Sequence, residues 1–352
     1  MNTIGRNLRL TTFGESHGPA MGGVIDGFPA GFKINFEKLK EDISKRKPGS
    51  SSLVTARNED DEPEFLSGLT DDGITLGTPI GFIVRNKDHH SSDYDDLKDK
   101  FRPNHADYTY ITRYGIRDHK GGGRASARET VNWVIAGSLA SQWLESQGVQ
   151  ISTVLSSVGE IDFSKELKSK LIKRPFELRS LSIPEEISRK FSDKILSIKK
   201  EGNSIGGAVT CLITGVKAGI GNPVFSKLQA SLAQAMMSIN AAKGFEYGSG
   251  FESKELTGIE SQDIFFKSEE NHLGTLTNYS GGIQGGIANG MPIFFTVAFK
   301  PTPTVLSELP TVDIQGNPTL INSRGRHDPC VAVRAVAVVR AMAALTITDA
   351  LI

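Results

Sequence analysis

Residues 119–130 have the sequence HKGGGRASARET, in which three consecutive glycines precede a charged helix start. Ser126 and Glu129, three residues apart, match a capping box, and apolar residues at roughly helical spacing follow them. Glycine lets the backbone approach a ligand closely, and Arg124 and Arg128 flank a helix N-terminus that favours an anion. The segment therefore predicts an anion site, with a purely structural glycine turn as the alternative. Its spacing matches neither a P-loop nor a dinucleotide-binding fingerprint.

The chain has 352 residues and a formal net charge of zero, with 40 basic and 40 acidic side chains. This length supports a large core, and the neutral balance argues against a nucleic-acid-binding protein that relies on broad electrostatic attraction. Two distant cysteines and a polar N-terminus without a signal peptide predict a cytoplasmic protein with free thiols. No apolar run reaches the roughly 20 residues of a membrane helix. Without repeats or a convincing linker, residues 1–352 are interpreted as a single domain.

Hydrophobic periodicity and turn residues predict alternating strands and helices along the chain. Strands are expected at residues 4–12, 22–28, 65–69, 74–76, 79–84, 149–158, 204–216 and 291–299. Helices are expected after the caps Asn35 and Ser126, at residues 107–114, 185–199 and 223–239, and at the C-terminus. In the C-terminal helix Asp328 is expected as N-cap and Pro329 as the first helical residue.

Several polar clusters are candidates for function on residue type alone. His17 lies on a glycine-flanked turn beside Glu15 and Ser16, which favours an acid or base, and His105 lies before the helix at 107–114. Small-residue turns at 240–246 and 280–286, and the cationic turn Lys300–Thr304, are either structural turns or cofactor contacts. Residues 87–96 carry histidines and aspartates without regular ligand spacing, so no metal site is predicted.

Three segments in order, FGESHG (13–18), GGGRASARET (121–130) and RGRHDPC (324–330), resemble the signatures of the chorismate synthase family. The resemblance extends over essentially the whole chain. It implies an α+β fold, a layered sandwich with helices packed between antiparallel sheets, assembled as a homotetramer. It also implies a lyase that converts 5-enolpyruvylshikimate 3-phosphate to chorismate and phosphate by 1,4-elimination. The resemblance further implies that reduced FMN is required without net redox change, and that NADPH or another reductant acts indirectly.

The resemblance also assigns roles to individual residues. His17 would protonate the leaving phosphate, His105 would tune the protonation of the reduced flavin, and Asp328 would assist proton removal at flavin N5, with Ser16 and Ser126 supplying hydrogen bonds to a relay. Anionic groups of the substrate would meet Arg46, Arg128 and Arg326. FMN would lie along a set of small, hydroxyl and cationic residues: Arg124, Ala125, Ser126, Asn240, Ala241, Gly285, Lys300, Pro301, Thr302, Pro303, Thr304 and Arg326.

Four positions depart from the pattern that the family more often shows. Asn104 stands in place of glycine, Ser52 in place of a second arginine, and Ala337 and Arg340 in place of proline and glutamate. These departures keep two alternatives open. The first is a noncatalytic flavin-binding or phosphometabolite-binding protein of the same fold, and the second is a flavin-dependent oxidoreductase.

Overall fold

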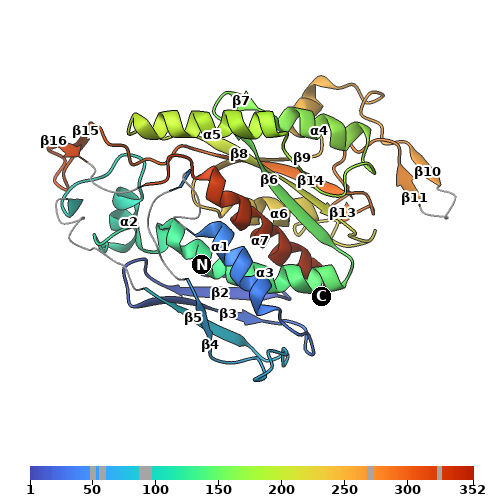
Figure 1. Ribbon diagram of the computed structural model, residues 1–352, viewed down its shortest axis with the longest axis horizontal. Coiled ribbons are helices and arrows are strands. Elements are labelled where there is room, and N and C mark those ends of the chain that lie inside the picture. Colours follow the sequence, from blue (N-terminus) through green and yellow to red (C-terminus); the bar gives the residue numbers. More distant parts are fainter. Residues whose placement is uncertain (48–52, 55–60, 87–96, 268–272, 323–326) are drawn as a thin grey trace.

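Two antiparallel sheets enclose a layer of helices in the computed structural model (Figure 1). The structure describes residues 1–47, 53–54, 61–86, 97–267, 273–322 and 327–352. Within these ranges the fold confirms the expected α+β sandwich, with helices between antiparallel sheets. No helix of the described residues is both long and apolar enough to cross a membrane.

The first sheet comes from the N-terminal quarter of the chain. Its strand order is β1 (Thr3–Ile4), β2 (Arg9–Gly14), β3 (Ala20–Asp26), β5 (Ile80–Arg85) and β4 (Pro63–Phe65). The single strand expected over residues 4–12 is wrong, because a turn separates β1 from β2. Oδ1 of Asp349 accepts the backbone N–H groups of residues 6, 7 and 8 and so stabilises that turn. The strand expected at 74–76 forms only isolated bridges.

The second sheet is built from strands between residues 150 and 299. Its strand order is β7 (Ile161–Asp162), β6 (Gln150–Val158), β8 (Gly207–Thr214), β14 (Ile293–Phe299) and β9 (Ala242–Tyr247). In the described parts of the chain, three two-stranded antiparallel pairs lie outside both sheets: β10 (Phe265–Lys267) with β11 (Leu273–Thr275), β12 (Ile283–Gln284) with β13 (Ile287–Ala288), and β15 (Glu308–Val312) with β16 (Pro318–Asn322).

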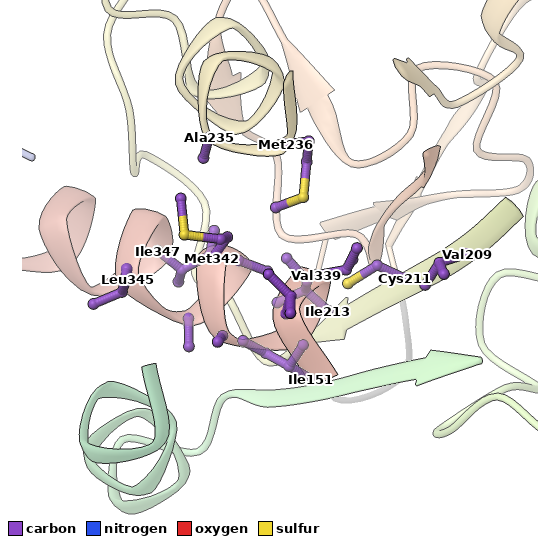
Figure 2. Close-up of a cluster of buried hydrophobic side chains, with 14 of the residues drawn as sticks. Ile151, Val209, Cys211, Ile213, Ala235, Met236, Val339, Met342, Leu345 and Ile347 are labelled. Carbon is purple, nitrogen blue, oxygen red and sulfur yellow. The ribbon is translucent and has the colours of Figure 1, made fainter. Parts of the chain in front are cut away.

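Helices α1 (Phe36–Arg46), α3 (Thr130–Ser146), α6 (Leu228–Met237) and α7 (Ala332–Leu351) form the layer between the sheets (Figure 1). Asn35 caps α1 as expected, since its Oδ1 accepts the N–H of Lys38 at 3.0 Å. Gly137 permits the close crossing of α3 and α7, because a Cβ there would lie 2.4 Å from the Cβ of Ala341. Figure 2 shows α7 contributing Val339 and Met342 to an apolar cluster with side chains of α6, β6 and β8.

The remaining helices differ in part from the expectations. α2 (Asp107–Tyr114) has the expected bounds, and α5 (Glu185–Lys200) matches closely. α4 (Ser164–Lys173) was not predicted, and it lies with α5 over the outer face of the second sheet (Figure 1). α6 begins at Leu228, and the expected helix over 223–239 is therefore too long at its N-terminus.

The C-terminal helix begins later than expected. α7 starts at Ala332 with Val331 at the N-cap position and no side-chain cap, so the predictions for Asp328 and Pro329 as cap and first residue are wrong. The side chain of Asp328 instead accepts a hydrogen bond from Arg334.

Both cysteines are free, as expected, and both are buried.

Candidate active site

A cavity of about 1550 Å³ lies where the first sheet, the glycine-rich segment and the start of α7 meet. A typical pocket for one small molecule has roughly 300–1000 Å³, so the volume of this cavity exceeds what one small molecule usually requires. Among the described residues, its charged lining consists of six arginines and one lysine against five carboxylates: Arg46, Arg102, Arg117, Arg124, Arg128, Arg334 and Lys300 against Glu15, Asp107, Asp118, Glu129 and Asp328. A neutral chain thus carries a locally cationic cavity.

The glycines of the opening segment pack against the FGESHG turn of the protein itself. A Cβ on Gly121, whose φ is +107°, would lie 2.2 Å from Nδ1 of His17. A Cβ on Gly123 would lie 2.6 Å from Oε2 of Glu15. Ser16 Oγ lies 3.1 Å from the same His17 nitrogen. Glycine is therefore required here for contact between two protein segments, and close approach to a ligand need not be invoked.

The helix start after the glycines contains half of the expected capping box. Ser126 Oγ accepts the N–H of Arg128 at 3.2 Å, across a 3₁₀ turn that precedes α3. The side chain of Glu129 does not accept the backbone N–H of Ser126, which would be the other half of the box. Its buried carboxylate accepts hydrogen bonds from Thr12 and from Arg124 Nη1, and burial raises the pKa of Glu129 against the opposing effect of these partners.

Arg124 is held against strand β2. Its Nη2 donates to the hydroxyl of Thr12 at 2.7 Å and to the carbonyl of Thr12 at 3.2 Å, and its Nη1 donates to Glu129 at 2.6 Å. Both terminal nitrogens of the guanidinium therefore have protein acceptors, although Arg124 lines the cavity. A contact between Arg124 and FMN remains a prediction.

Arg46 and Arg128, both predicted to bind the substrate, meet at one buried carboxylate. Asp61 accepts a hydrogen bond from Arg46 Nη1 at 2.6 Å through Oδ2 and from Arg128 Nη1 through Oδ1. Arg46 Nε also donates to Thr130 Oγ1 at 3.1 Å, and Arg128 Nε donates to Asn86 Oδ1 at 3.1 Å. The two arginines form one preorganised cationic group. The sequence analysis missed Asp61, which carries no local signal beyond its place in an acidic run.

A second carboxylate holds another pair of arginines. Asp107, the first residue of α2, accepts hydrogen bonds from Nε and Nη2 of Arg102 at 2.8 and 2.7 Å. Arg117 Nη1 approaches the same carboxylate to 2.7 Å. Burial would raise the pKa of Asp107, but the hydrogen bonds and charge of Arg102 and the charge of Arg117 outweigh burial and lower it. All three residues line the cavity, and none had been predicted as a site residue.

His105 is oriented from both sides of its ring. Nδ1 lies 3.0 Å from the carbonyl oxygen of Pro103, and Nε2 lies 3.2 Å from Thr304 Oγ1. A carbonyl oxygen can only accept, so Nδ1 carries the proton in the neutral ring and Nε2 accepts from Thr304. Burial, the charge of Arg102 and that of Lys300 lower the pKa of His105, which favours the neutral imidazole.

Lys300 ties the predicted cofactor turn to the loop that carries His105. Its Nζ donates to the carbonyl of Asn104 at 3.1 Å, and its backbone N–H donates to Ala241 at 3.0 Å. Burial, followed by the nearby charge of Lys243, lowers the pKa of Lys300. Asn104 has a φ of +60°, a region in which asparagine replaces glycine at modest cost. The departure at Asn104 is thus compatible with the loop.

Asn240 and Ala241 lie at the end of α6 and line the cavity. The amide nitrogen of Asn240 donates to the carbonyl of Ala125 at 2.8 Å. Its Oδ1 is buried and has no hydrogen-bond partner among the described residues. An unpartnered buried acceptor is costly, so this oxygen is suited to receive a ligand N–H.

The predicted residues are only partly brought together. Among the described lining residues are His105, Asp328, Ser126, Arg46, Arg128, Arg124, Ala125, Asn240, Ala241, Lys300, Thr302, Pro303 and Thr304. Ser16, His17 and Pro301 do not belong to the described lining, although Ser16 and His17 pack against Gly121. Gly285, also outside this lining, is exposed at the turn between β12 and β13. Arg326 and Ser52 lie outside the described residues, as does the stretch 87–96. No cluster of three potential metal ligands occurs in the described parts of the chain.

Arg340, the charge-reversed departure, has two acidic partners on neighbouring helices. Its Nη1 donates to Asp42 of α1 at 2.9 Å and its Nη2 to Glu145 of α3 at 3.2 Å. Nη2 also donates to Ser141 Oγ at 2.9 Å. The arginine is therefore accommodated by the helix layer, and it does not belong to the described lining of the cavity.

The comparisons with known proteins agree with this architecture. The family model for chorismate synthase matches residues 8–352. A chorismate synthase of Phocaeicola vulgatus is 51% identical over 349 residues, which cover 99% of this chain and 97% of that protein. One of Parabacteroides distasonis is 49% identical over 359 residues, covering 100% of this chain and 98% of the relative. A solved structure titled "Crystal Structure of Chorismate Synthase" superposes with a TM-score of 0.76 at 29% identity, covering 99% of this chain and 92% of that one. The chain belongs to the chorismate synthase family of lyases, which act in the shikimate pathway.

Proposed function

We propose that the protein converts 5-enolpyruvylshikimate 3-phosphate to chorismate and inorganic phosphate by 1,4-elimination, with reduced FMN as cofactor. The observation that carries the proposal is the arginine-rich cavity of about 1550 Å³, which described residues of all three signature segments line. Family membership adds the reaction, and the cavity adds a volume and a charge suited to two phosphate-bearing molecules.

The substrate carries one phosphate and two carboxylates, so it requires a focused cationic group. Arg46 and Arg128, held together by Asp61, supply such a group at one wall. The pair Arg102 and Arg117, held by Asp107, supplies a second. Arginine is preferred over lysine for such contacts because its planar fork can donate two parallel hydrogen bonds to one anionic group.

Residues around the end of α6 and the turn 300–304 fit a flavin nucleotide. The unpartnered acceptor Asn240 Oδ1 suits an N–H of the isoalloxazine ring, and Lys300 suits a phosphate or a ring carbonyl. A reduced flavin held by these residues would supply the electron density that the elimination requires. Arg124 to Ser126, Thr302 to Thr304, Gly285, Pro301 and Arg326 complete the proposed cofactor contacts.

The proton chemistry falls to His17, His105 and Asp328. His17 protonates the leaving phosphate, and Ser16 Oγ at 3.1 Å from its Nδ1 orients the ring. His105, whose neutral form is favoured by its surroundings and whose ring is oriented by Pro103 and Thr304, would tune the protonation of the reduced cofactor. Asp328 assists proton removal, and Ser126 donates a hydrogen bond to the relay. Histidine suits proton-transfer steps because the ordinary pKa of an imidazole is close to neutral pH.

An anaerobic assay of purified protein with substrate and chemically reduced FMN tests the proposal. We expect release of one phosphate for each chorismate formed, with no reductant consumed beyond that needed to reduce the cofactor. Folded, flavin-bound protein that releases no phosphate would overturn it and favour a noncatalytic binding protein. Stoichiometric consumption of reductant would favour an oxidoreductase. A parallel reaction with NADPH in place of the chemical reductant shows whether the protein reduces its own FMN.

The same proposal covers assembly and location. We propose a homotetramer of a single domain spanning residues 1–352, acting in the cytoplasm on a small molecule, without nucleic acid, membrane or metal. One apolar core runs from Leu8 to Ile347 and includes residues of both sheets, which supports a single domain. Light scattering of the purified protein tests the tetramer, since a monomer would give about one quarter of the expected mass.

A further inference from the structure

Arg334 lies in the first turn of α7, and no role had been assigned to it. Its Nη1 donates to Oδ2 of Asp328 at 2.7 Å, and its Nε donates to the backbone carbonyl of Arg46 at 2.8 Å. The side chains of Arg334 and Asp328 are 13% and 9% exposed. Both residues line the large cavity. One guanidinium thus contacts the proposed proton-removing carboxylate and the end of α1.

The two contacts connect parts of the site that are far apart in the sequence. Arg46 is the last residue of α1, and its own side chain is held by Asp61 and Thr130. Asp328 precedes α7 by four residues, outside the helix. Its backbone carbonyl accepts a hydrogen bond from Thr302 Oγ1 at 2.8 Å, which ties it to the proposed cofactor turn. The side chain of Asp328 is therefore oriented from α7, and its backbone from the turn 300–304.

We propose that Arg334 is a positioning residue. It holds the Asp328 carboxylate in the cavity at a fixed position relative to Arg46, the last residue of α1. The inference rests on the proposed function, in which Asp328 assists proton removal. A hydrogen bond to one oxygen, Oδ2, restricts rotation of the carboxylate about χ2. Because a charge-assisted hydrogen bond is stronger and shorter than a neutral one, an arginine is better suited to this task than an uncharged donor.

The test compares Arg334→Gln with Arg334→Lys in the anaerobic turnover assay. Loss of the guanidinium is expected to lower kcat about tenfold to hundredfold, because small misplacements of a reacting group cost up to about that much. KM is expected to change less than about threefold, since Asp61 and Thr130 still hold the Arg46 side chain. Arg334→Lys keeps the positive charge and one donor nitrogen, and it should recover part of kcat.

A double-variant cycle separates positioning from a general structural role. In an Asp328→Asn background, Arg334→Gln should cost less than about twofold in kcat, because the group it orients is already gone. Multiplicative losses, or full turnover of Arg334→Gln, would overturn the inference. Crystal structures of the variants give a second readout that does not depend on activity. We expect the Asp328 side chain to leave its orientation in Arg334→Gln while the backbone of residues 327–332 stays in place.

Arg340→Gln is the matched control. Arg340 lies on the same helix and also pairs with carboxylates, but it does not belong to the described lining of the cavity. Arg340→Gln should lower the thermal midpoint of unfolding and change kcat by less than about twofold. FMN affinity, measured by fluorescence quenching, should be unchanged in all variants. A wild-type protein without turnover would refute the proposed function itself, whereas active wild type with an unaffected Arg334→Gln would refute only the role of Arg334.

Discussion

Asp61→Asn is the substitution with the largest expected effect on the cationic wall of the cavity. The Asp61 side chain is 0% exposed, and it pairs with Arg46 at 1% and Arg128 at 8% exposure. Asparagine preserves the shape but removes the negative charge between two buried guanidiniums. Removing one partner from a buried ion pair costs about 3–5 kcal/mol, because the remaining charge is left uncompensated.

The cost converts into a measurable thermal shift. An unfolding entropy of about 2.1 cal/mol/K per residue over 352 residues gives a fall of about 4–7 °C in the thermal midpoint. The lower part of this interval is expected, since Thr130 and Asn86 still accept hydrogen bonds from the two arginines. Inorganic phosphate should raise the midpoint of Asp61→Asn more than that of the wild type, because the anion replaces the missing charge.

Differential scanning calorimetry, with and without millimolar phosphate, measures both effects. Asp26→Asn is the control, because Asp26 pairs with Arg9 at side-chain exposures of 39% and 54%. Exposed pairs contribute about 0–1 kcal/mol, so this control should shift little. Equal midpoints for the two variants would refute the idea that Asp61 holds a buried cationic pair. A phosphate effect no larger than in the wild type would refute the link to anion binding.

Three further predictions follow from the contacts around the site. Gly121→Ala should lower turnover strongly, because its Cβ would lie 2.2 Å from Nδ1 of His17. Gly115→Ala is the control: Gly115 also has a positive φ, but a Cβ there would meet nothing within 4 Å, so turnover should change little. Similar turnover of the two variants would contradict the packing argument. His105→Gln should reduce the loss of folding stability on acidification. Burial and neighbouring cations lower the pKa of His105 in the folded state, so the unfolded chain binds more protons as the pH falls below about 6.5. If the variant and the wild type lose the same unfolding free energy in urea denaturation between pH 7.5 and 5.5, this reasoning is wrong. Asp349→Ala should lower the free energy of unfolding by about 1–3 kcal/mol, because the backbone N–H groups of residues 6–8 lose their acceptor. Hydrogen exchange at these three amides should become faster. Unchanged exchange rates would show that Asp349 does not stabilise this turn.

Local sequence signals predicted those features whose physics is local. The cap at Asn35 and the bounds of α2 depend on residues within one or two turns, and both were confirmed. The three glycine-rich and charged signatures identified the family, and the resemblance to it implied the layered fold. One local signal failed because of a distant partner: the carboxylate of Glu129 accepts a hydrogen bond from Thr12, 117 residues away, and does not bond to the backbone N–H of Ser126 as a capping box requires.

The sequence by itself determined the family, most of the helices, the longer strands other than β9, and the identity of the candidate acids, bases and arginines. The turn expected at 240–246 was wrong in part, because residues 242–247 pair with β14 as strand β9. Only the tertiary structure decided which arginine meets which carboxylate. Asp61 lies between Arg46 and Arg128, and Arg334 bridges Asp328 and the end of α1 across 288 residues of sequence. Such pairings depend on how α1, α3 and α7 pack between the two sheets, and an ion pair is a short-range contact whose partners are set by that packing and not by spacing along the chain.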